Sequence, residues 1–157
     1  VGKNTGLMGR WECIQTTPRI ILDVAHNEHG IKALLEQLES LHYAQLHIVT
    51  GMVKDKDVNA VLNLLPKKAK YYFTQSHIPR ALPVSELASK GNTFDLYGSQ
   101  FENVNIALQA ANKNANANDL ILVLVIAPVT SDSVKSANAF ASEYICLNSI
   151  CNKYRKR

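Results

Sequence analysis

The polar residues with the richest potential chemistry are Asp23, His26 and Asn27, which come at the end of the apolar run 20–22. A carboxylate accepts hydrogen bonds from hydroxyl groups, and an imidazole titrates near neutral pH. Free N–H groups at the start of a following helix attract anions. Two interpretations are open from these residues alone. They form a ligand-binding corner, or they are a turn acid, a surface histidine and a helix cap.

Two further polar clusters also follow apolar runs. Lys54-Asp55-Lys56-Asp57 comes after residues 46–52, and a loop with His77 and Arg80 comes after residues 71–74. Either cluster can be a solvated loop. The carboxyl ends of parallel strands meet at one edge of a sheet, so we expect all three clusters at one rim. Asn27, Lys56 and Arg80 are therefore candidate contacts to a substrate or phosphate.

The elements that must position these clusters alternate between strands and amphipathic helices. This alternation predicts a three-layer α/β/α domain with a mostly parallel sheet, and a hairpin at 11–22 that adds an antiparallel edge strand. We expect strands at 11–14, 20–22, 46–52, 71–74, 94–97 and 120–126. We expect helices at 28–41, at 58–65 with Asp57 as cap, at 83–90 with Gly91 beyond its end, at 104–111 and at 134–144.

Composition excludes several classes of function. The 157 residues are 46% hydrophobic and 19% charged, which fits one globular domain and excludes disorder. The net charge of +4 equals the four positive charges of residues 153–157, so nothing indicates nucleic-acid binding. The longest apolar run, 120–128, is too short for a membrane span.

The cysteines and the missing motifs narrow the interpretation further. The three cysteines have no metal-ligand spacing, which favours a reducing, cytoplasmic location, and the first residue is not methionine, which suggests a fragment. No glycine-rich phosphate-binding motif is present. A nucleotide site on this chain would therefore be only half complete.

Several segments, in order, resemble one known family. They are Gly9-Arg10-Trp11-Glu12, the block 18–27 ending in Asp-Val-Ala-His-Asn, Gly51-Met52 with residues 55–57, and Pro79-Arg80-Ala81. From residue 9 to 119 the chain resembles the C-terminal domain of folylpolyglutamate synthase/dihydrofolate synthase, a family of Mur-type ATP-dependent amide ligases. The resemblance implies a Rossmann-like domain at 10–145. It also implies a linker at 1–9 from a missing N-terminal/central ATPase domain, and a frayed basic tail at 146–157.

The resemblance also implies a reaction and its participants. ATP phosphorylates a folate or dihydropteroate carboxylate, and the amino group of L-glutamate attacks the acyl phosphate. The P-loop and the Mg²⁺ ligands belong to the missing domain, so we expect no metal ligand here and no activity from the fragment alone. We expect a monomer with no nucleic-acid or membrane partner.

Roles carry over by position within the matching segments. Arg10 and Asp23 would contact ATP, with Asp23 at the ribose hydroxyls. His26 would be catalytic, near the γ-phosphate and the glutamate. Asn27 would cap the helix, and Lys56 would add a ligand contact.

The chain departs from the family at 124–131, where Pro128 stands in place of a Gly-Ser turn. Three alternatives therefore stay open. The first is a peptidoglycan Mur ligase domain, although such domains usually carry a lysine-containing block where this chain has His26. The second is a non-catalytic binding domain of the same fold, and the third is an unrelated structural α/β domain.

Overall fold

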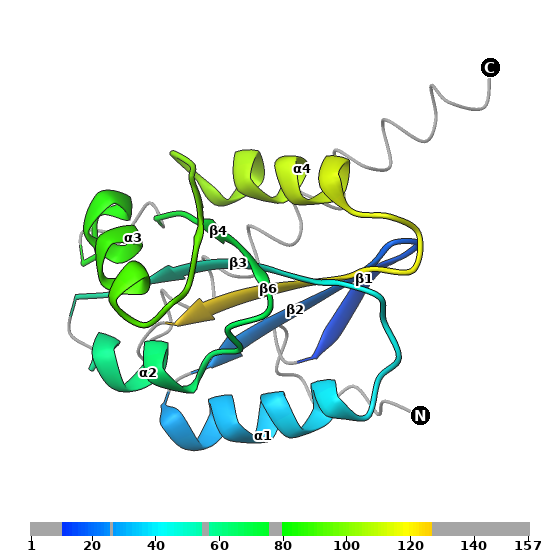
Figure 1. The fold of residues 1–157 in the computed structure, drawn as a ribbon, viewed down its shortest axis with the longest axis horizontal. Coiled ribbons are helices and arrows are strands. Elements are labelled where there is room, and N and C mark those ends of the chain that lie inside the picture. Colours follow the sequence, from blue (N-terminus) through cyan, green and yellow to red (C-terminus); the bar gives the residue numbers. More distant parts are fainter. Residues whose placement is uncertain (1–10, 26, 55–56, 76–79, 127–157) are drawn as a thin grey trace.

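The computed structural model describes residues 11–25, 27–54, 57–75 and 80–126 (Figure 1). The expected linker at 1–9, the helix at 134–144 and the tail at 146–157 lie outside these residues. The strands are β1 Glu12–Thr16, β2 Arg19–Ala25, β3 Leu46–Met52, β4 Lys70–Phe73, β5 Gly98–Gln100 and β6 Leu120–Ile126. The helices are α1 Glu28–Glu39, α2 Val58–Leu64, α3 Val84–Thr93 and α4 Val104–Asn114.

The strands form one six-stranded sheet in the order β1-β2-β6-β3-β4-β5. β1 pairs antiparallel with β2 at one edge, and the other pairs are parallel. The predicted mostly parallel sheet with an antiparallel hairpin strand is therefore confirmed. The apolar strand β6, last in sequence among the described elements, lies in the centre between β2 and β3, buried on both faces as its continuous apolar sequence requires.

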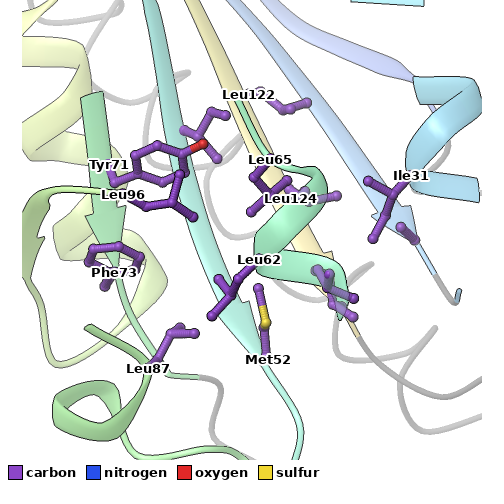
Figure 2. Packing of buried hydrophobic residues seen from close by; sticks show 14 of the residues in the cluster. Ile31, Met52, Leu62, Leu65, Tyr71, Phe73, Leu87, Leu96, Leu122 and Leu124 are labelled. Atoms are coloured by element: carbon purple, nitrogen blue, oxygen red, sulfur yellow. The ribbon is translucent and has the colours of Figure 1, made fainter. Parts of the chain in front are cut away.

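Helices cover both faces of the sheet, which confirms the three layers (Figure 1). One hydrophobic cluster joins alternate residues of the central strands to α1, α2 and α3, and the other joins the intervening residues to α4. Figure 2 shows Met52, Leu62, Phe73 and Leu87 meeting in the first cluster. In the part of the chain that the structure describes, no helix is both long and apolar enough to cross a bilayer.

Two sequence predictions about α3 and its surroundings are wrong. Gly91 lies inside α3 rather than beyond its end, and the helix packs closely there, since a Cβ at Gly91 would lie 2.8 Å from Phe73 Cζ. The predicted strand at 94–97 is the turn after α3, in which Leu96 is fully buried in the core. The strand β5 begins at Gly98, directly after the predicted segment ends. A side chain at Gly98 would collide with the carbonyl of Tyr71.

Candidate functional site

The strands that precede the first two polar clusters end at the same level of the sheet. Ala25 of β2 lies beside Ile126 of β6, which in turn lies beside Met52 of β3. The backbone N–H of Val53 then donates to the carbonyl of Ile126 over 3.2 Å. The segments that follow β2 and β3 therefore leave the sheet at one rim, on either side of β6.

The third polar segment is attached to this rim by backbone hydrogen bonds. Leu82 N–H donates to the Met52 carbonyl over 2.9 Å, and Lys54 N–H donates to the Arg80 carbonyl over 2.8 Å. Val53 and Ala81 form an antiparallel bridge between these two bonds. Arg80 is exposed beside the start of the charged loop, so the two basic segments meet as predicted.

Asp23 lies two residues before the end of β2, half-buried, beside Leu124 of β6. Its Oδ2 accepts a hydrogen bond of 2.9 Å from the backbone N–H of Trp11. Trp11 has a φ of 48°, in the left-handed region. That conformation costs a non-glycine residue about 1–2 kcal/mol, and a hydrogen bond to a charged acceptor contributes a similar amount, so the contact offsets the strain.

Asn27 caps α1, as predicted. Its Oδ1 accepts from Gly30 N–H over 2.8 Å, and its backbone is extended, as a cap residue requires. The carboxamide oxygen is therefore committed to the helix, and a ligand contact from Asn27 would have to use its NH₂ group. The cap fixes the N-terminus of α1 at the same rim as Asp23.

A hollow of about 430 Å³ lies between α2 and α3, next to the end of β3. Its polar lining is Lys54, Asp57, Asn59, Glu86 and Lys90. Asp57 caps α2 by accepting from Ala60 N–H over 3.1 Å. Among the described residues neither lysine forms an ion pair, so both ammonium groups are available to an anion.

The remaining predicted site residues, Arg10, His26 and Lys56, lie outside the described residues, and their roles stay predictions. Within the described ranges, no group of three or more His, Cys, Asp or Glu side chains is arranged to hold a metal ion. The part of the candidate site that the structure describes thus consists of the oriented Asp23 carboxylate, the start of α1 capped by Asn27, and exposed basic side chains.

The opposite end of the sheet carries a buried polar network built on His47. His47 Nδ1 lies 3.0 Å from the Tyr72 hydroxyl, and Nε2 lies 2.9 Å from Asp119 Oδ2. Asn114 Nδ2 donates to the same hydroxyl over 3.3 Å. With a proton on Nε2, His47 accepts from the Tyr72 hydroxyl and donates to Asp119, so each of these three side chains has a partner.

Asp119 is held as a carboxylate in this network. Burial by itself would raise its pKa, but hydrogen bonds from the Asn116 backbone, from His47 and from the Gln45 backbone, together with the electrostatic attraction of His47, outweigh burial and lower the pKa below its usual range. A hollow of about 540 Å³ opens at this end of the sheet beside Arg19 and His42. Of the predicted site residues that the structure describes, none lines this hollow.

The sheet order and the two helical layers define a Rossmann-like α/β domain, in which polar loops gather at the carboxyl rim of the sheet. Residues 9–124 match the family described as Mur ligase, glutamate ligase domain. The chain belongs to this family.

Individual relatives agree with this membership. The chain is 35% identical over 119 residues to the dihydrofolate synthase/folylpolyglutamate synthase of Buchnera aphidicola subsp. Schizaphis graminum, a match that covers 74% of this chain and 28% of the relative. A crystal structure of the bifunctional enzyme from Yersinia pestis, complexed with AMPPNP and a Mn ion, superposes with a TM-score of 0.72 at 26% identity, covering 87% of this chain and 31% of that one.

A further crystal structure of such a bifunctional enzyme, with Mn, AMPPNP and L-glutamate bound, gives a TM-score of 0.74 at 26% identity. It covers 90% of this chain and 33% of that chain. The described domain therefore spans about a third of the solved enzymes that it resembles.

Proposed function

We propose that this chain acts as the C-terminal domain of an ATP-dependent ligase that joins L-glutamate to the carboxylate of a folate or of dihydropteroate. The observation that carries the proposal is the meeting of the Asp23 strand, the Lys54 loop and the Arg80 segment at one rim of a Mur ligase domain. Solved relatives with ATP analogues, Mn and L-glutamate support the choice of ligands.

Asp23 suits the ribose of ATP. Its Oδ2 is oriented by the N–H of Trp11, and two neighbouring hydroxyl groups are donors of the right spacing for one carboxylate. Arg10 would bind phosphate oxygens, because a guanidinium forms paired hydrogen bonds to them. His26 would donate a hydrogen bond near the γ-phosphate and orient the acyl-phosphate step.

The basic groups at the rim suit the second substrate. L-glutamate brings two carboxylates, and Arg80 with Lys54 presents two cations whose backbones are joined by a hydrogen bond of 2.8 Å. Lys56 would add a third cation in the same loop. In the proposed reaction the γ-phosphoryl group moves to the acceptor carboxylate. The amino nitrogen then bonds to the acyl carbon as phosphate leaves, and the amine gives up a proton.

The rest of the enzyme would supply what the chain lacks. We propose that an N-terminal/central ATPase domain, joined through residues 1–9, holds the phosphate loop and Mg²⁺, and that 10–145 forms the domain described here, followed by a basic tail at 146–157. The isolated domain would not turn over. We further propose a cytoplasmic monomer that closes over its substrates, because a site divided between two domains must assemble for each reaction cycle.

The described part of the divergent stretch 124–131, residues 124–126, belongs to the regular strand β6. β6 stays in unbroken register with β2 from Arg19–Leu120 to Ala25–Ile126. The strand that separates the two halves of the site is therefore complete.

The test is phosphate release from ATP by the full-length ligase carrying this domain. Release that requires both L-glutamate and either dihydropteroate or a reduced folate is the expected result. Release only with a peptidoglycan precursor would assign the domain to that branch of the Mur ligases instead. No release with any acceptor would favour a non-catalytic binding domain.

A further inference from the structure

The backbone of Trp11 contacts Asp23 in a way that the proposed reaction does not by itself explain. The two residues are 12 positions apart, and the N–H of Trp11 donates to Asp23 Oδ2 over 2.9 Å. Trp11 directly precedes β1, whereas Asp23 lies inside β2. The contact therefore ties the point where the chain enters the sheet to the acid proposed to bind ATP.

The geometry of the hairpin explains how this contact arises. Glu12 of β1 pairs with Leu22 of β2, so Trp11 stands where the ladder would next pair with Asp23. The φ of 48° at Trp11 ends the ladder instead and turns the amide toward the Asp23 side chain. The tryptophan side chain is half-buried against the hydrophobic cluster that α1, α2 and α3 share with the sheet, and this packing restrains the uncommon backbone conformation.

A carboxylate held in this way is prepared for a ligand. The two oxygens of a carboxylate offer about four acceptor positions, so a bond from the Trp11 N–H is compatible with bonds from hydroxyl donors. Fixing its orientation before the ligand arrives removes part of the entropy cost of binding. A loose carboxylate on the same strand would have to be ordered during each binding event.

We infer that Trp11 is a positioning residue for nucleotide binding: its backbone N–H, held by the packed indole ring, fixes the Asp23 carboxylate in the orientation that accepts ribose hydroxyls. The inference rests on the proposed function, since it requires Asp23 to contact ATP. It adds that the affinity for ATP depends on the backbone conformation at residue 11.

The first experiment compares steady-state kinetics of Trp11 variants of the full-length ligase. Trp11→Pro removes the N–H and forbids a positive φ, so we expect the KM for ATP to rise about tenfold, with kcat and the KM for glutamate within about twofold. Trp11→Phe keeps the donor and a ring, and should return the KM for ATP to within about twofold of the wild-type value. Cys13→Pro disturbs β1 without touching Asp23, and it controls for general damage to the hairpin.

A double-mutant cycle with Asp23→Ala separates positioning from a purely structural role. If Trp11 acts through Asp23, Trp11→Pro has no further effect on the KM for ATP in the Asp23→Ala background. An equal rise in both backgrounds overturns the inference and leaves the proposed function intact. An unchanged KM for ATP in Asp23→Ala alone refutes the proposed role of Asp23 and the inference with it.

A second variant keeps the test decisive if Trp11→Pro does not fold. Replacing the amide of residue 11 by an ester removes the donor but keeps the indole ring and permits the same backbone conformation. The same cycle with Asp23→Ala then applies, with the same two outcomes.

Discussion

Replacing Asp119 by alanine should strongly destabilise the domain. The substitution removes the acceptor of two hydrogen bonds, from His47 Nε2–H at 2.9 Å and from Asn116 N–H at 3.0 Å. His47 is fully buried, so water cannot replace the lost acceptor. A buried donor left without a partner costs about 1–3 kcal/mol, so loss of the His47 contact predicts a destabilisation of about 1–3 kcal/mol, whereas the N–H of the exposed Asn116 can turn to water.

The measurement is urea denaturation of this chain and of two variants at pH 7. The control is Asp95→Asn, which weakens an ion pair with Lys67 of 3.5 Å whose side chains are 63% and 62% exposed. Exposed pairs contribute about 0–1 kcal/mol, so this variant should unfold within about 1 kcal/mol of the wild type. Equal losses in both variants would refute the conclusion that the buried network stabilises the fold.

The pH dependence gives a second test of the same network. The pKa of Asp119 is lowered in the folded state from its ordinary value of 3.8. Between the lowered and the ordinary value the unfolded chain binds more protons, so stability falls as pH falls. The contribution of Asp119 is complete above about pH 5 and is lost in stronger acid. The difference in unfolding free energy between the wild type and Asp119→Ala should therefore shrink below pH 4, and a constant difference would contradict the assignment.

Three further predictions follow from single sites. Gly91→Ala should destabilise the chain by about 1–3 kcal/mol in the same denaturation assay, because the new methyl would lie 2.8 Å from Phe73 Cζ. Asn27→Ala should cost about 1 kcal/mol of stability through loss of the α1 cap, whereas Asn27→Asp should retain most of it. In the full-length ligase, Asp23→Ala should raise the KM for ATP at least about tenfold, and His26→Ala should mainly lower kcat; wild-type kinetics in both would contradict the proposed site.

The sequence predicts the elements with strong periodicity well. β3 and β6 are found at the predicted bounds, because continuous apolar runs with flanking polar loops fit few other structures. Asp57 and Asn27 cap their helices as predicted, since capping depends on neighbouring residues only. The errors fall where contacts between distant residues determine the structure. Gly91 lies within a helix that packs closely against Phe73, 18 positions earlier in the chain (91 − 73).

The candidate site could be predicted only in part. Motif order places Asp23 and Arg80 at one rim, and parallel topology explains why. The Trp11 contact could not be predicted, because it depends on a left-handed backbone conformation at a residue that seldom adopts one. The Lys90 contribution to the hollow at the rim was also missed, since it depends on how α3 packs beside α2.

The two acids discussed most, Asp23 and Asp119, should act independently although both adjoin β6. Asp23 lies beside Leu124, five residues along the strand from Asp119 (124 − 119). At a rise of about 3.3 Å per residue the two sites are roughly 16 Å apart, beyond the range at which substitutions usually couple. A ligase with both Asp23→Ala and Asp119→Ala should therefore show the ATP defect of the first and the stability loss of the second, added together. A marked excess over that sum would mean that the network at the amino end of the sheet also shapes the rim.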